Sequence, residues 1–136
     1  MPTTLLAVDD SATMRKVLEM TFAGEDYKVV TANSADSALA LAKTERPAIV
    51  VSDITLEGKS GYDFCTAFKK DYPNVPVLLL SSKLHPYDPA KGQACRADDH
   101  IDKPFDSQQM IDRVRSLLTS PRQVAAATPQ VAAKPS

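Results

Sequence analysis

The stretch "LLAVDDSAT" at residues 5–13 joins a run of apolar residues to two adjacent aspartates, Asp9 and Asp10. The apolar run is typical of a short buried strand, and the residues that follow place apolar side chains at helical spacing. Like charges repel each other, so the end of a buried strand is a costly position for two carboxylates. The stretch therefore predicts a strand that leads directly into a helix, and it raises the question of what holds the acidic pair there.

Strands and helices are predicted to alternate along the whole chain. Strands are expected at residues 4–8, 27–32, 48–53, 75–82 and 100–103, and helices at 12–22, 35–46, 62–72 and after Asp106. The third strand, "AIVVSD", is apolar up to its last two residues, as expected for a strand covered on both faces. This order predicts an α/β fold with a doubly wound, five-stranded parallel sheet and helices on both faces.

Local signals predict where several helices begin and which side of the first helix faces the core. Ser34 is placed to cap the second helix, and Asp106 with Gln109 forms a capping box for the last one. The fourth helix is expected to be short, with Asp88 as its cap and Pro89 at its first position, because proline fits only in the first turn. The first helix is expected to turn four residues toward the core: Met14, Val17, Leu18 and Phe22.

Polar side chains stand where the predicted strands end: Asp9, Asp10, Asp53, Ser81 and Lys103. In a doubly wound sheet the carboxyl ends of the strands meet at one edge, where ligands bind. Crowded carboxylates would partly protonate unless a cation lies among them. A hard divalent ion such as Mg²⁺ needs only a few carboxylates besides water and phosphate oxygens, so it would explain the acidic pair. The alternative is that Asp9 and Asp10 only favour the positive end of the following helix.

Four segments resemble the receiver domain of two-component response regulators, the CheY-like family: "VDDSATMR", "VSDIT", "VLLLSS" and "DKPF". The resemblance covers about residues 4–119 and implies a flavodoxin-like fold. It implies that Asp53 accepts a phosphoryl group from a histidine kinase or a histidine phosphotransferase. It also implies a Mg²⁺ site in which Asp10 binds the ion directly and Asp9 acts through water. Asp53 and the backbone carbonyl of Thr55 would complete the protein's share of the metal shell.

The resemblance further assigns the contacts of the phosphoryl group. Ser81 would donate a hydrogen bond to it, and Lys103, before a cis bond to Pro104, would pair with its charge. His100 occupies the position of the aromatic switch residue, where it would alternate between buried and exposed states; a surface histidine without that role is the alternative. Four neighbouring residues also suggest a second metal site, but alternate residues of a strand face opposite sides: Asp98, Asp99, His100 and Asp102.

The resemblance implies a phosphorylation-dependent signalling switch whose output is contact with a downstream protein target. Its chemistry would be slow, self-catalysed phosphoryl transfer and dephosphorylation, not that of a metabolic enzyme. One alternative is a pseudo-receiver, in which the same fold serves as a constitutive docking module. Another is a small flavodoxin-like or phosphatase-like enzyme. No Gly-rich phosphate loop follows the first strand, and a phosphatase would need an aspartate where Thr55 stands, so both enzyme interpretations are weaker.

Composition argues against several other classes of protein. The net charge is -1 and no Lys/Arg cluster stands out, so nucleic-acid binding is not expected. No signal peptide or bilayer-spanning run is evident, so we expect no membrane insertion and a cytoplasmic location. Cys65 and Cys95 are expected to be reduced, packed thiols. Residues 1–120 are predicted to form the receiver domain. Residues 121–136, rich in Pro and Ala, are predicted to form a disordered tail or linker, similar to those of bacterial polarity and motility regulators.

Overall fold

The sheet consists of five parallel strands in the spatial order β2-β1-β3-β4-β5. The structure is a computed structural model that describes residues 3–56 and 58–119, so the predicted tail lies outside the described residues. Its strands are β1 (Thr3–Val8), β2 (Tyr27–Ala32), β3 (Ile49–Asp53), β4 (Val77–Ser81) and β5 (Asp99–Asp102). Its helices are α1 (Ala12–Thr21), α2 (Ala35–Glu45), α3 (Gly61–Asp71), α4 (Pro89–Ala94) and α5 (Ser107–Thr119). The predicted doubly wound α/β fold is confirmed.

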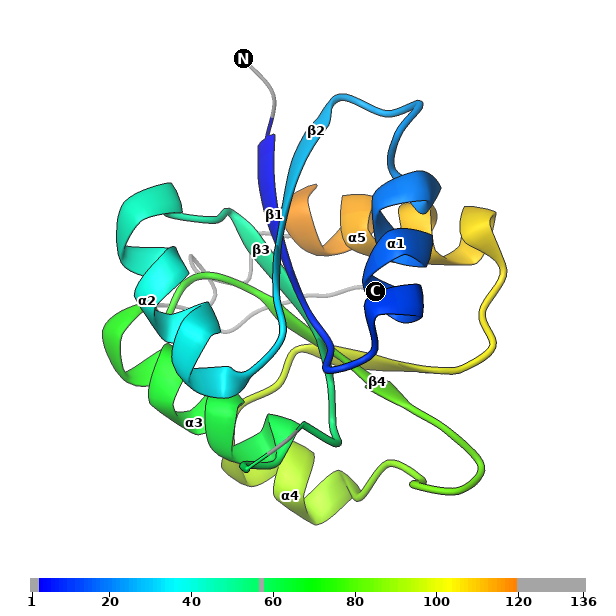
Figure 1. The fold of residues 1–136 in the computed structure, drawn as a ribbon. Coiled ribbons are helices and arrows are strands. Elements are labelled where there is room, and N and C mark those ends of the chain that lie inside the picture. The colour runs from blue at the N-terminus through cyan, green and yellow to red at the C-terminus, as the bar shows by residue number, and fades with distance from the viewer. Residues whose placement is uncertain (1–2, 57, 120–136) are drawn as a thin grey trace.

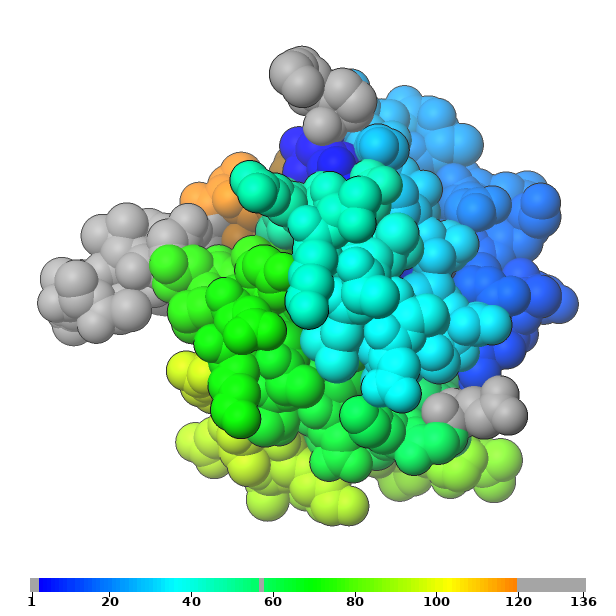
Figure 2. All heavy atoms as spheres, turned by 60° about the vertical axis from the view of Figure 1, so that its left-hand side comes forward, coloured from blue at the N-terminus to red at the C-terminus, as the bar shows by residue number. Residues whose placement is uncertain are grey.

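The helices cover both faces of the sheet (Figure 1). Helices α1 and α5 pack on one face, and α2, α3 and the end of α4 pack on the other. Figure 2 shows α2 and α3 side by side on the outside of the second face. The chain leaves β1 for the edge strand β2 and then returns to β3 on the other side of β1. The direction of winding therefore reverses between β1 and β3, which is where folds of this kind bind their ligands.

The central strands supply both hydrophobic cores. Every residue of β3 and β4 is buried, as expected for parallel strands covered on both faces. Successive side chains of β4 alternate between the two cores, so Leu79 packs with Phe64 and Phe68 of α3, whereas Leu80 packs with Leu18 of α1. These packed strands give the carboxyl edge of the sheet a rigid base.

The helix boundaries follow the local signals in the sequence. Ser34 caps α2 and forms a reciprocal capping box with Ser37. Asp88 caps the six-residue α4, whose first residue is Pro89, so the short fourth helix is confirmed. The carboxylate of Asp106 accepts a hydrogen bond from the backbone N–H of Gln109 (3.1 Å) at the start of α5. Arg46, in the left-handed region (φ 49°), ends α2 just before Pro47.

The first helix differs from the prediction at one position. Leu18 and Phe22 are fully buried and Met14 packs against them, but Val17 is 38% exposed. Residues 14, 18 and 22 form one row at four-residue spacing, and this row packs into the core cluster that the sheet and α5 share. Val17 lies beside the row, next to the more exposed Met20.

The first residue of α3 must be glycine, because the backbone after β3 lies against it. The N–H of Gly61 donates to the carbonyl of Ile54 (2.7 Å), and a Cβ at Gly61 would lie 2.1 Å from the carbonyl oxygen of Asp53. Gly61→Ala should therefore lower the free energy of unfolding by about 1–3 kcal/mol, measured by urea denaturation. Gly24→Ala is the matched control: nothing lies within 4 Å of its Cβ, and the change should stay within about 0.5 kcal/mol. Equal effects of the two substitutions would contradict the close approach.

Candidate functional site

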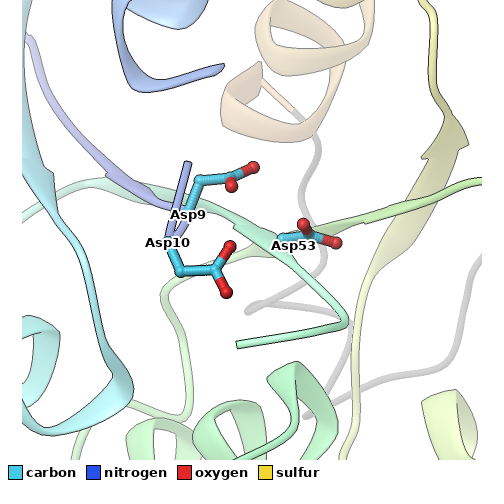
Figure 3. Close-up of side chains that lie close together, drawn as sticks. All are labelled: Asp9, Asp10 and Asp53. Carbon is cyan, nitrogen blue, oxygen red and sulfur yellow. The ribbon is translucent and has the colours of Figure 1, made fainter. Parts of the chain in front are cut away.

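Three carboxylates meet at the carboxyl edge of the sheet, where the winding reverses. Asp9 and Asp10 extend from the end of β1, and Asp53 is the last residue of β3 (Figure 3). One oxygen from each side chain lies within 4.8 Å of the others. Among residues 3–56 and 58–119 this is the one group of three or more acidic, His or Cys side chains with such spacing. The predicted acidic pocket is therefore present, and the described residues 98–102 form no second one.

Asp9 is held rigidly, with one carboxylate oxygen left over. Its Oδ1 accepts a hydrogen bond from the backbone N–H of Ser11 (2.9 Å), and its backbone carbonyl accepts one from Nη1 of Arg15 (2.8 Å). Its Oδ2 is buried and has no hydrogen-bond partner in the part of the chain that the structure describes. Nζ of Lys103 lies 3.8 Å from this oxygen, too far for a hydrogen bond. A buried carboxylate oxygen without a partner is costly, so this oxygen is suited to bind a ligand.

The surroundings of Asp9 disfavour its charge. Burial raises the pKa of Asp9 to about 6; the Ser11 hydrogen bond opposes this rise, and repulsion from Asp53 adds to it. Asp53 is also buried, whereas Asp10 is exposed to solvent. The pocket thus offers buried and exposed carboxylate oxygens together, the donor type that hard divalent cations prefer. Both the donor set and the unpartnered oxygen fit a bound divalent cation.

Asp53 has a fixed partner on each carboxylate oxygen. Its Oδ1 accepts a hydrogen bond from the backbone N–H of Thr55 (3.2 Å), and its Oδ2 pairs with Nζ of Lys103 (3.0 Å). Lys103 follows β5 directly, its bond to Pro104 is cis, and its backbone N–H donates to the carbonyl of Ser81 (2.7 Å). These contacts bring together one nucleophilic carboxylate and one ammonium group beside the acidic pair.

Ser81 is fully buried at the end of β4, and its hydroxyl donates to the carboxylate of Asp102. Asp102 is the residue opposite Ser81 in the β4–β5 pairing. The sequence predicted a role for Ser81 but missed this partner. The strands predicted at residues 75–82 and 100–103 do not determine the register that places Asp102 opposite Ser81.

His100 is exposed and stacks on the ring of Tyr87, with ring centroids 3.8 Å apart and planes 4° from parallel. The hydroxyl end of Tyr87 lies over Gly92 of α4, where a Cβ would be 1.7 Å from the phenol oxygen. Tyr87 therefore packs the loop before α4, whereas Leu84 in the same loop is 83% exposed. No pattern in the sequence predicts the stacking of Tyr87 on His100.

The two cysteines lie outside the acidic pocket, in the core between α3 and α4. Both are free and buried, and the Cys65 thiol donates to the backbone carbonyl of Cys95 (3.2 Å). Burial raises the pKa of the Cys65 thiol, with the nearby Cys95 adding to the rise. A protonated, enclosed thiol is poorly reactive, in keeping with the predicted packing role.

Residues 5–115 match the family model of the response regulator receiver domain. The chain belongs to this family. The transcriptional regulatory protein TcrX of Mycobacterium tuberculosis is 35% identical over 117 residues, which are 86% of this chain and 50% of TcrX. A response regulator of Chloroflexus aurantiacus superposes with a TM-score of 0.82 at 30% identity, over 88% of this chain and 100% of that chain. The chemotaxis protein CheY4 of Vibrio cholerae superposes with a TM-score of 0.81 at 28% identity, over 86% and 99%.

Membership fixes the broad role of the domain. Receiver domains are the phosphorylation-dependent signalling switches of two-component systems, and this chain is one of them. The chain spans about half the length of the curated relatives named for transcriptional regulation that it matches. No helix within residues 3–56 and 58–119 has the length and apolar character needed to cross a membrane.

The raised pKa of Asp9 predicts how pH changes the stability of the metal-free protein. Between the usual value of 3.8 and about 6, the folded protein binds more protons than the unfolded chain. Raising the pH through this window should therefore lower the free energy of unfolding, by up to about 3 kcal/mol. Urea denaturation with a chelator at a series of pH values measures this fall. Asp9→Asn should remove it and Asp10→Asn should keep it; a fall of the same size in Asp9→Asn would assign it to other groups.

Proposed function

We propose that this receiver domain accepts a phosphoryl group on Asp53 from a histidine kinase or a histidine phosphotransferase and passes the signal to a downstream protein target by direct contact. The observation that supports this most is the position of Asp53. Its carboxylate lies within 4.8 Å of the acidic pair and 3.0 Å from the Lys103 ammonium group. A nucleophile, a compensating cation and a cluster of metal-binding oxygens therefore share one pocket, and phosphoryl transfer depends mainly on such positioning and charge neutralisation.

The metal that fits this role is Mg²⁺. Asp10 would bind it directly, Asp9 would act through water, and Asp53 with the backbone carbonyl of Thr55 would complete the protein ligands. The unpartnered Oδ2 of Asp9 and the spacing of the carboxylates support this assignment. When bound, Mg²⁺ supplies positive charge that offsets the charge of the transferred group.

Asp53 is phosphorylated in one displacement step and dephosphorylated in another. An oxygen of Asp53 attacks phosphorus, the bond from phosphorus to the donor's histidine nitrogen breaks, and an acyl phosphate forms on Asp53. Lys103, which pairs with Asp53 in the resting protein, shifts its charge to the new phosphoryl oxygens. Water later attacks the phosphorus and restores the carboxylate with release of inorganic phosphate. These self-catalysed steps are slow compared with those of a metabolic enzyme.

The signal leaves the pocket through Ser81 and His100. Both lie on the sheet face covered by α3 and α4, because His100 and the Ser81 partner Asp102 are alternate residues of β5. The Ser81 hydroxyl moves to the phosphoryl group, and His100 then rotates inward and leaves its stack with Tyr87. The surface beside α4 changes as a result and forms the contact with the target. A relay of this kind operates in the cytoplasm, and we assign the domain to that compartment.

The nucleophile assignment predicts the outcome of phosphorylation with a small donor. The protein is incubated with Mg²⁺ and acetyl phosphate, and its intact mass is measured over time. The wild-type protein should gain one labile phosphoryl group, and Asp53→Asn should gain none, because the amide keeps the shape without the nucleophilic oxygen. Asp71→Asn, an exposed position at the end of α3, is the control and should be phosphorylated normally.

Three results would contradict this assignment. An adduct on Asp53→Asn would place the nucleophile elsewhere. A wild-type protein that gains no phosphoryl group would indicate a constitutive docking module. Repeated consumption of the donor without an adduct would indicate a phosphatase.

The metal assignment predicts that Asp10 dominates the affinity for Mg²⁺. Loss of a direct ligand should weaken binding at least about tenfold, because fewer oxygens remain to replace the ion's water. Titration of Mg²⁺ followed by amide NMR compares the wild-type protein with Asp10→Ala. Asp112→Ala is the control. It removes an exposed carboxylate of α5 that pairs with Arg115 and does not belong to the acidic cluster, so this variant should bind Mg²⁺ normally. Equal affinities of all three proteins would rule out a metal site at Asp10.

A further inference from the structure

The Ser81 hydroxyl has a partner that the proposed chemistry does not use. Ser81 has no exposed surface (0%), and its hydroxyl donates to a carboxylate oxygen of Asp102. Asp102 itself lies at the exposed end of β5. The contact joins the last residues of two neighbouring strands, whose backbones are paired in register at this point. The backbone N–H of Lys103 donates to the carbonyl of Ser81 (2.7 Å) and holds the two strand ends together.

We propose that Asp102 is a positioning residue that holds the Ser81 hydroxyl in the resting state and thereby opposes phosphorylation of the domain. This inference rests on the proposed function, in which Ser81 donates to the phosphoryl group. A serine hydroxyl has one proton to donate. It therefore donates either to Asp102 or to a phosphoryl oxygen, and the first hydrogen bond must break before the second forms.

The different exposure of the two partners makes this exchange reversible. Ser81 is buried, so its hydroxyl would be left unsatisfied if it had neither acceptor, and an unsatisfied buried group is costly. Asp102 is exposed, so water replaces the hydroxyl as soon as the hydrogen bond breaks. The resting and phosphorylated states each satisfy the hydroxyl, and the strength of the Ser81–Asp102 hydrogen bond sets the balance between them.

Asp102 could also oppose phosphorylation by simple charge repulsion. It directly precedes Lys103, whose Nζ lies 3.0 Å from Asp53, so its negative charge lies close to the pocket. Repulsion of this kind does not need the Ser81 hydroxyl, whereas the proposed positioning role does. A double-mutant cycle separates the two, because only the positioning effect disappears when Ser81 is replaced.

The experiment measures binding of beryllium fluoride, a phosphoryl mimic, with saturating Mg²⁺ and amide NMR as the readout. Asp102→Ala should lower the half-saturating concentration by between about threefold and tenfold, the range for one broken hydrogen bond. Asp102→Asn should lower it by less, because its amide oxygen still accepts from the Ser81 hydroxyl but carries no charge. In a Ser81→Ala background the same substitutions should change it by less than about twofold. Asp99→Asn is the matched control, because it removes a carboxylate from the same strand that pairs with Arg113 (2.8 Å) and not with Ser81. It should leave the binding curve unchanged.

A second measurement needs no ligand. In the resting protein Asp102→Asn should shift the NMR signals of Ser81, and Asp99→Asn should not. Thermal denaturation of each variant checks that it is folded. If Asp102→Ala does not fold, the isosteric Asp102→Asn replaces it in the measurements.

The outcomes are distinct. An Asp102 effect that persists in the Ser81→Ala background means repulsion and overturns the positioning role. Variants that bind like the wild-type protein, or resting signals that do not shift, also overturn it. A wild-type protein that binds no phosphoryl mimic overturns the proposed function instead, and the resting signals then decide whether the Ser81–Asp102 hydrogen bond exists.

Discussion

Crowded negative charge at one edge of the sheet is the constraint on which the rest of this structure depends. Three carboxylates share that edge with the ammonium group of Lys103, and one buried oxygen of Asp9 has no hydrogen-bond partner among the described residues. Left to itself, such a cluster would relax by moving apart or by protonation. The fully buried strand β3 prevents the first, because Asp53 cannot move without disturbing both cores. The pocket therefore keeps an electrostatic cost in the resting protein, and any cation or charge-neutralising event there relieves it.

Strand β5, which leads directly to Lys103, is the least enclosed part of the sheet. β5 is an edge strand of four residues, and only Ile101 among them is buried. Its inner neighbour β4 is buried throughout and does not give way easily. Small changes at the pocket are thus more easily absorbed by side chains of β5, such as Asp102 and His100, than by the packed centre. A rigid site next to a loosely covered edge is a suitable arrangement for a switch, because the change in shape is confined to one side.

Much of this arrangement could be predicted from sequence because it depends on local rules. The helix caps at Ser34 and Asp88 depend only on the few residues around them. The alternation of strands and helices determines that the carboxyl ends of the strands meet at one edge of the sheet. The acidic pocket followed from that convergence alone. Contacts that depend on tertiary register were beyond reach. Whether Val17 is covered depends on where α5 lies, and the partner of Ser81 depends on how β4 and β5 align. The ring that covers His100 comes from a loop whose path no periodicity describes.

The contact between Tyr87 and Gly92 links the sequence of α4 to the surface around His100. The phenol oxygen fills the space that a Cβ at position 92 would need, and the same ring stacks on His100 with its face. Helix α4, the loop before it and the edge strand are therefore interlocked through one aromatic side chain. A side chain at position 92 would make the phenol end of Tyr87 shift, and the ring face that stacks on His100 would shift with it. The residue at position 92 can therefore change how the imidazole is covered without touching it.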